Sequence, residues 1–397
     1  MFRLRLWYSL PAMRIFVLGA GASGSYLAQL LARQGHQVTC GDRDPERARR
    51  FLGKKNTLPV VQANARNVRS VVRAARGCHL LVNASPAKFN ESALRAALRL
   101  RAHYLDLPAH MVRNPFKAEQ LAYDKRFAEK RRAAVINAGV APGLTNLLAA
   151  RSAELLDQLD TVHIRLYEST DGEPISQWSA EGTFDEAVSH PRIYRNGRFH
   201  LAKRFSERER FRFPAPIGEA NVVLAAQDEV GTLPHTLKLK QLDVKIGGNE
   251  IDRLRRWHRQ GKLHRSRGLV VARFPHTPTP RQVARLIRGG KLQNARFAAA
   301  VIAHGMRKDR PLEIRWDVTF PTLYQIRMRG LGVSPIAYAT AQMAALVVRY
   351  FPRDLGGVFA PESLPAEIRR DVLNGARARG FRITMKTRQG KSPLDDD

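Results

Sequence analysis

The sequence predicts an α/β protein in which a doubly wound parallel sheet is followed by a second α/β domain with a mixed sheet. A glycine-rich turn stands between a short apolar strand and an amphipathic helix near the N-terminus. Strands and helices then alternate through the first third of the chain, as they do where helices connect parallel strands. Beyond residue 144 strands become more frequent, which indicates a second sheet of another kind. With 397 residues, the chain is long enough for two or three domains with sizeable cores.

The glycine turn carries the strongest functional signal. It reads Gly19-Ala20-Gly21-Ala22-Ser23-Gly24, after an apolar strand over 14–18 and before a helix that reaches residue 31. Gly19 permits the tight turn, Gly21 lets the backbone approach a pyrophosphate, and Gly24 lets the helix pack closely on the strand. The helix start, which includes Ala22 and Ser23, would face the phosphates with its free N–H groups and its dipole. This pattern predicts a Rossmann dinucleotide-binding domain.

The second strand supports a dinucleotide and leaves its identity open between NAD and NADP. Residues 37–41 form this strand, and Asp42 follows about 20 residues after the glycines, where an acid meets the ribose hydroxyls of NAD. Arg43 is adjacent and suits the additional phosphate of NADP. The alternative is a glycine-rich structural turn that binds nothing.

The chain is strongly basic. Lys and Arg number 67 against 35 Asp and Glu, which gives a formal net charge of +32. Such a surplus attracts nucleic acid, acidic membranes and anionic ligands. The basic residues are scattered and form no nucleic-acid-binding motif, so we expect a solvated basic surface and no specific nucleic-acid partner. A functional contact with a polyanion remains the alternative.

Cysteine usage and hydropathy indicate the compartment. The two cysteines, Cys40 and Cys78, adjoin apolar strand residues and read as buried thiols in a reduced compartment. Residues 1–12 differ from a secretory signal, and no run of about 20 apolar residues exists to cross a bilayer. We therefore expect a cytoplasmic protein with no membrane span and no metal site.

We divide the chain into a dinucleotide-binding domain over 13–143, a substrate and dimerisation domain over 144–334, and C-terminal helices over 335–390 that pack back on the first domain. The first domain contains further strands at 57–62, 79–82, 103–107 and 133–136. The second contains a helix at 145–156, a basic helix at 250–267, and strands at 161–166, 242–246, 268–274, 296–303 and 312–318. The C-terminal helices cover 335–351 and 364–379.

Ligands bind at the carboxyl ends of the strands in a sheet of this type. Three stretches lie at such ends, at 83–86, 106–110 and 137–143. We expect these stretches to converge on the nicotinamide, with Asn83, Ala84 and Ser85 among the cofactor contacts.

Several motifs, in this order along most of the chain, resemble those of the saccharopine dehydrogenase family. The glycine turn is the least specific of them. More specific are an Asn-Ala-x-Pro turn, a Tyr-x-Asp strand end, a Gly-x-x-Pro-Gly-x-x-Asn block, a Trp-Ser-x-Glu element and a Gly-Val-x-x-Pro-Glu element. They correspond to residues 83–86, 104–106, 139–146, 178–181 and 357–362, and the stretches 213–218 and 231–234 match further second-domain elements.

The resemblance implies an oxidoreductase that uses NAD or NADP to interconvert an imine and a secondary amine. It also implies a small-molecule substrate with carboxylate or amine groups and a homodimer. The chain departs from the family pattern at 167–174, where a Gly-Gly-x-Pro turn is usual, so the particular substrate stays open.

Two residues are candidates for acid–base catalysis. Asp106, at a strand end beside the cofactor, would handle a proton or orient the substrate amine, unless its carboxylate only caps the following loop. His110 would titrate near neutral pH, unless it is merely a solvated loop histidine.

Four residues are expected around the substrate. Trp178 and Glu181 would line the pocket, with Trp178 alternatively a core anchor of the second domain. Pro142 and Gly143 would shape the domain junction through their backbone geometry.

Three functions are therefore compatible with the sequence. The leading one is an NAD(P)-dependent oxidoreductase acting on a carbon–nitrogen bond of an amino-acid or polyamine-like substrate. The second is a dinucleotide-binding sensor or scaffold of the same fold that has lost or changed the chemistry. The third is a basic polyanion-binding protein.

Overall fold

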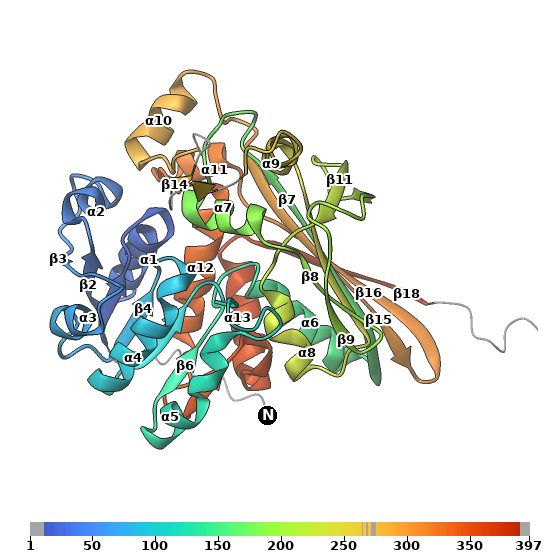
Figure 1. Cartoon of the computed structure of the whole chain (residues 1–397), viewed down its shortest axis with the longest axis horizontal. Coiled ribbons are helices and arrows are strands. Elements are labelled where there is room, and N and C mark those ends of the chain that lie inside the picture. The colour runs from blue at the N-terminus through green and yellow to red at the C-terminus, as the bar shows by residue number, and fades with distance from the viewer. Residues whose placement is uncertain (1–11, 264, 267–268, 271–274, 390–397) are drawn as a thin grey trace, which may run out of the picture.

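The computed structural model describes residues 12–389 except 264, 267–268 and 271–274. It contains two large sheets side by side, with helices α12 (Pro335–Arg349) and α13 (Ala366–Ala378) between them (Figure 1). None of the described helices is both long and apolar enough to cross a bilayer. The chain ends, including most of the segment 1–12, lie outside the described residues.

The first sheet has seven parallel strands in the order β17-β6-β5-β4-β1-β2-β3. Its strand order reverses between β1 and β4, which is the doubly wound arrangement that binds dinucleotides. The predicted Rossmann domain is therefore confirmed. The strands are β1 (Arg14–Leu18), β2 (Gln37–Asp42), β3 (Val60–Gln62), β4 (Leu80–Asn83), β5 (His103–Asp106), β6 (Ala133–Val135) and β17 (Gly357–Phe359).

Both faces of this sheet are buried. Ile15 and Val17 of β1 belong to a core shared with α1 and α12, whereas Phe16 and Leu18 belong to the core under α3 and α4. A strand covered on both faces is apolar at successive positions, as β1 is from Ile15 to Leu18. The covering elements are α1 (Ala22–Arg33), α2 (Pro45–Leu52), α3 (Val68–Ala74), η1 (Ala87–Phe89), α4 (Asn90–Leu100), η2 (Glu119–Tyr123) and α5 (Asp124–Glu129).

The second sheet is mixed, as predicted. Strands β7 and β12 are parallel, and all other described pairs in this sheet are antiparallel. The order is β10-β11-β12-β7-β15-β16-β18, with the hairpin β8–β9 attached to β12. The strands are β7 (Gln158–Ser169), β8 (Arg192–Arg195), β9 (Arg198–Leu201), β10 (Glu209–Arg212), β11 (Glu219–Leu224), β12 (Gln241–Gly247), β15 (Arg296–Arg307), β16 (Arg310–Thr319) and β18 (Arg382–Gln389).

The helices of the second half differ from expectation at one place. The helix predicted over 250–267 ends at Arg259, and Gly261 follows with a φ of +66°. Of the strand predicted over 268–274, only β14 (Leu269–Val270) is described, paired with β13 (Arg265–Ser266). The remaining elements are α6 (Leu144–Leu155), α7 (Ala180–Val188), η3 (Glu229–Gly231), α8 (Leu233–Thr236), α9 (Asn249–Arg259), α10 (Pro280–Arg288) and α11 (Leu323–Met328).

The C-terminal segment links the two halves. Helix α12 packs on α1, where the rings of Tyr26 and Tyr338 stack with centroids 5.7 Å apart and Gln342 Nε2 donates to the Tyr26 hydroxyl at 2.9 Å. After η4 (Pro361–Ser363), the chain passes through α13 into β18. Residues 335–390 therefore contain two strands besides the predicted helices, β17 in the first sheet and β18 in the second. The domain boundaries at 143 and 334 stay predictions.

Candidate dinucleotide and substrate site

The glycine turn has the geometry that a pyrophosphate requires. Gly19 has a φ of +94°, and a Cβ there would lie 2.7 Å from the backbone nitrogen of Ser85. A Cβ at Gly24 would lie 1.9 Å from the carbonyl oxygen of Gly19, whereas a Cβ at Gly21 would meet nothing within 4 Å. The turn is thus packed tightly on the protein side and open at Gly21. The residues fit a dinucleotide phosphate group at the N-terminus of α1.

Asp42 lies at the end of β2 and stabilises the glycine turn. Its Oδ2 accepts from the Ala20 N–H at 2.9 Å, and its Oδ1 accepts from the Asp44 N–H at 3.0 Å. Each carboxylate oxygen keeps a second lone pair for a ribose hydroxyl. The adjacent Arg43 is exposed. The position fits the predicted ribose contact and leaves the choice between NAD and NADP open.

The turn after β4 is built around Asn83. This side chain is fully buried, and its Nδ2 donates to Asn90 Oδ1 at 2.8 Å. Its Oδ1 accepts from both the backbone and the hydroxyl group of Ser85. Asn83 therefore shapes the turn, while the half-buried Ala84 and Ser85 lie against Gly19 and Gly24. As cofactor contacts, all three stay predictions.

Asp106, at the carboxyl end of β5, is a buried carboxyl group that accepts several hydrogen bonds. Its Oδ2 accepts from the Tyr104 hydroxyl at 3.0 Å and from Gln120 Nε2 at 3.1 Å, and its Oδ1 accepts from the Asn137 N–H at 2.9 Å. Burial raises the pKa of Asp106 to about 7, and these hydrogen bonds oppose the rise. Because Asp106 has no exposed surface and bonds to the backbone of Asn137, the geometry favours a role in holding the neighbouring loops over direct proton exchange with a substrate.

His110 is held by a carboxylate. Its Nδ1 lies 3.0 Å from Glu119 Oε2, and Glu119 Oε1 accepts from the N–H groups of Val112 and Arg113 at 2.9 and 2.8 Å. Although burial acts in the opposite direction, these N–H groups and His110 lower the pKa of Glu119. A charged Glu119 fixes the imidazole and leaves its Nε2 for another partner.

The segment after β6 begins and ends in constrained backbone. Asn137 is fully buried with a φ of +58°, and neither its side-chain oxygen nor its side-chain nitrogen has a partner. Pro142 follows a cis peptide bond, and Gly143, with a φ of +134°, would place a Cβ 2.0 Å from the Gly139 carbonyl oxygen. Pro142 and Gly143 are buried, so their contribution is to backbone geometry. Their proximity to a substrate stays a prediction.

Trp178 and Glu181 lie in the second half, at the start of α7, and both are half-buried. Glu181 forms an ion pair with Lys88, which follows the β4 turn in the first half. The pair brings α7 to the edge of the sheet where the strand ends meet. Trp178 covers Gly182, where a Cβ would lie 2.4 Å from the indole ring. Contact with a substrate stays a prediction for both.

The second half of the chain contains four carboxylates that the sequence analysis did not identify. We call them the acidic cluster: Glu168, Glu186, Asp228 and Glu250. Burial raises the pKa of Glu168 to about 8 and that of Glu250 to about 7. Burial likewise raises the pKa of Asp228 to about 6 and that of Glu186 above its ordinary range. These residues come from β7, α7, the loop before η3 and α9, so no spacing in the sequence indicates them.

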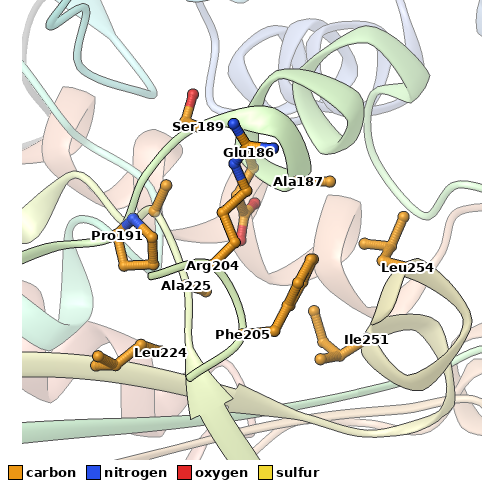
Figure 2. A pocket seen from close by; sticks show the side chains of 11 residues that line it. Glu186, Ala187, Ser189, Pro191, Arg204, Phe205, Leu224, Ala225, Ile251 and Leu254 are labelled. Atoms are coloured by element: carbon orange, nitrogen blue, oxygen red, sulfur yellow. The ribbon is translucent and has the colours of Figure 1, made fainter. Parts of the chain in front are cut away.

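Asp228 connects the acidic cluster to the first half, because its Oδ2 accepts from the Ala109 N–H at 3.1 Å. Glu186 borders a hollow of about 260 Å³, its open mouth included, which also presents Arg204 and Ser189 (Figure 2). Among the described residues, no three His, Cys, Asp or Glu side chains are grouped as metal ligands.

Residues 15–140 match the family model of the saccharopine dehydrogenase NADP binding domain. The match covers the first, dinucleotide-binding part of the chain. The resemblance that the sequence motifs predicted is thereby confirmed, as is a cofactor of the NAD or NADP type.

Two solved structures are similar to most of the chain. The L-glutamate-forming saccharopine dehydrogenase of Saccharomyces cerevisiae is similar over 95% of this chain and 100% of its own, with 12% identity and a TM-score of 0.65. The DAP dehydrogenase of C. glutamicum, solved with DAP, covers 94% of this chain and 100% of its own, with 12% identity and a TM-score of 0.47. The similarity to the yeast structure shows that the two chains share their fold.

Replacing Gly21 by valine should abolish dinucleotide binding without unfolding the protein, because the new side chain enters open space where the phosphates would lie. Calorimetric titration with NADH and NADPH at about 0.3 M salt, which screens exposed charges, measures the loss. Thermal unfolding should be unchanged. In contrast, Gly24→Ala should lower the unfolding temperature, since its Cβ collides with Gly19. Tight nucleotide binding by the Gly21 variant would contradict the assignment.

Asp106→Asn should reduce the pH dependence of stability. The pKa of Asp106 is raised to about 7 in the folded state, so the unfolded state gives up its proton first. Stability linked to this group is thus present below about pH 4 and is lost between about pH 4 and 7. Urea unfolding at pH 5 and pH 8 should show a smaller difference for the variant than for the parent. An equal difference would show that Asp106 ionises freely.

Proposed function

We propose that this protein is an NAD(P)-dependent oxidoreductase that interconverts an imine and a secondary amine on an amino-acid or polyamine-like substrate. The observation that carries the proposal is the meeting of three features at one edge of the first sheet. The open glycine turn lies against Ala84, the β5 end carries the His110–Glu119 pair, and Asp228 of the acidic cluster bonds to Ala109. These contacts support a site in which a dinucleotide, an acid–base group and groups for a charged substrate would lie near one another.

The first half supplies the cofactor site. The N–H groups at Gly21, Ala22 and Ser23 would hold the pyrophosphate, and Asp42 would accept from a ribose hydroxyl. The nicotinamide would give or take a hydride when bound. The Asn83-centred turn and Asp106 would keep the strand ends in the arrangement that borders it.

His110 is the better candidate for proton transfer, and Asp106 acts as a positioning residue. The imidazole is partly exposed and oriented by Glu119, which is the arrangement of a base held by a second group. An imine reduction requires a proton on the nitrogen, and His110 Nε2 would deliver it or take it back in the reverse direction.

The second half supplies groups for a charged substrate. Glu186 and Arg204 line the same hollow, so one wall can meet an ammonium group and another a carboxylate (Figure 2). The Nε atom of Arg204 is buried and has no hydrogen-bond partner.

The proposal also places the protein in the cytoplasm as a homodimer. Light scattering of the purified chain tests whether it is a dimer.

The competing function is binding of a polyanion, which the net charge of +32 favours. Such binding falls steeply as salt rises, whereas nucleotide binding in a preformed turn persists at about 0.3 M salt.

The oxidoreductase proposal predicts turnover. NADH or NADPH should be oxidised, with loss of the absorbance of the reduced nicotinamide, when an aldehyde and an amino compound are supplied together. His110→Gln should lower kcat at least tenfold without changing nucleotide affinity. The matched control is His200→Gln, at an exposed position of β9. Nucleotide binding without turnover on any amine and aldehyde pair would favour the sensor or scaffold.

The cofactor preference should respond to charge at the end of β2. Asp42→Asn keeps an oxygen acceptor for the turn but removes the charge that would repel the additional phosphate of NADP. The ratio of NADP to NAD affinity should rise about tenfold, which corresponds to about 1.4 kcal/mol. Arg43→Ala should move the ratio in the other direction. Both are measured by calorimetry, and an unchanged ratio in both variants would remove these residues from the discrimination.

A further inference from the structure

The edge of the first sheet opposite the glycine turn carries a row of basic side chains. All strands of this sheet are parallel, so their amino ends lie along one edge in the order β17-β6-β5-β4-β1-β2-β3. Six consecutive strands, from β17 to β2, begin at an arginine or histidine or within four residues after one. We call these residues the basic edge, and in the order of the strands they are Arg353, Arg132, His103, His79, Arg14 and His36.

Hydrogen bonds between neighbouring strands hold these side chains in place. The N–H of His103 donates to the His79 carbonyl at 2.9 Å, and the N–H of Arg14 donates to His79 Nδ1 at 3.3 Å. His103 Nδ1 accepts from the N–H of Ala133, the residue after Arg132, at 3.0 Å. Because paired strands lie about 4.8 Å apart, the members of the basic edge from β6 to β1 are direct neighbours.

The segment that leads into β17 follows the same edge. The ring of Phe351 contacts the His103 imidazole, with centroids 5.4 Å apart, and the N–H of Arg353 donates to the Phe351 carbonyl at 2.9 Å. At the end of the segment, the N–H of Gly357 donates to the Arg132 carbonyl at 3.0 Å. The backbone around Arg353 is therefore fixed beside the starts of β5 and β6. Burial and the charges of Arg132 and Arg353 lower the pKa of His103 to about 4.

The basic edge presents donors that lack acceptors. The Nδ1 atoms of His36, His79 and His103 each accept a backbone hydrogen bond, so the proton of each neutral imidazole is on Nε2. Burial is the main cause that lowers the pKa of all three, which favours this neutral form. Among the described residues, no carboxylate forms an ion pair with any member of the basic edge.

Arg353 has two donor atoms without an acceptor. Its Nε and Nη2 atoms are buried and form no hydrogen bond, and no other arginine in the described part of the chain has two such atoms. The rest of the side chain is partly exposed. Burial lowers the pKa of Arg353, and the charge of the adjacent Asp354 acts in the opposite direction. Buried donors are nearly always paired in folded proteins, so these two indicate that an acceptor comes from a ligand.

Stabilisation of helix ends does not account for the basic edge. Arg33 and Arg99 lie in the last turns of α1 and α4, where a positive charge meets the negative end of the helix dipole. The members of the basic edge belong instead to the strand starts and to the segments that lead into them. Their donors therefore need another partner.

We propose that the basic edge binds a phosphate-type oxyanion, with Arg353 as the main contact and His79 and His103 as further donors. A phosphate group brings negative charge and several acceptor oxygens, which this edge lacks, and a guanidinium binds two such oxygens at once. Four residue steps along β1, about 13 Å, separate this site from the glycine turn. No bond is made or broken there, and the inference does not depend on the proposed function.

The test uses the full chain with inorganic phosphate as probe and glycerol 3-phosphate as an organic ester. Titration at about 0.15 M ionic strength, with chloride replacing phosphate, separates specific binding from general attraction to a basic protein. Calorimetry should show saturable binding of phosphate, and the unfolding temperature should rise with phosphate and not with chloride. Binding of both probes would assign the site to phosphate groups in general, and binding of inorganic phosphate alone would assign it to the free anion.

Arg353→Gln should weaken phosphate binding at least tenfold and leave the affinity for NADH and NADPH unchanged. His79→Gln is the second variant, at an exposed position, and its amide oxygen can still accept from the Arg14 N–H; it should weaken phosphate binding severalfold. The matched control is Arg310→Gln, which removes the same charge from an exposed position at the start of β16. Gly21→Val, which blocks the dinucleotide turn, should not change phosphate binding.

Three results would overturn the inference. The first is no saturable binding of phosphate by the parent chain at constant ionic strength. The second is an equal effect of Arg353→Gln and Arg310→Gln. The third is loss of phosphate binding in Gly21→Val together with its retention in Arg353→Gln, which would place the anion in the glycine turn. If phosphate binds as expected but neither NADH nor NADPH binds, only the oxidoreductase proposal fails.

Discussion

The candidate site depends on one buried carboxyl group. Asp106 accepts hydrogen bonds from its own strand, from Gln120 of η2 and from the backbone of Asn137 beyond β6, and Tyr104 carries the network on to Asn83. Three neighbouring strand ends are thus fixed to one another without any contact to solvent. Such a network specifies one arrangement only while every member is satisfied. A preorganised edge of this kind holds the cofactor turn in one position relative to the residues that would meet the substrate.

A second constraint joins residues that are far apart in the sequence. Asn146 at the start of α6 donates to Glu362, 216 residues later, and its Oδ1 accepts from the N–H of Gly143. Lys88 and Glu181 connect the β4 turn with α7, and β17 and β18 distribute the last part of the chain between the two sheets. The halves are therefore not independent units in series. Opening them for ligand exchange would require these contacts to yield, with the Lys88–Glu181 pair the most exposed of them.

The sequence predicted what depends on local pattern. The glycine turn, Asp42 at the end of β2 and the alternation of strands and helices follow from spacing, and the structure places them as expected. Strand β17 was not predicted, because three residues have no periodicity and need a partner strand over 200 residues away. Asn83 could be located but its burial could not, since that depends on Asn90 and Tyr104 packing above it. The acidic cluster could not be predicted from the sequence, because each of its members is an isolated acidic residue on a different element.

The distribution of charge gives the structure two electrostatic environments. The chain has 67 Lys and Arg residues, of which only Arg165 and Lys245 are buried in the part that the structure describes, and the resulting positive surface raises the local concentration of anions such as a dinucleotide. In the second half, burial raises the pKa of each carboxyl group in the acidic cluster, so part of the cluster is protonated near pH 7. An anionic cofactor would thus be attracted by the basic surface before it reaches the glycine turn, and the acidic cluster contributes nothing to that attraction.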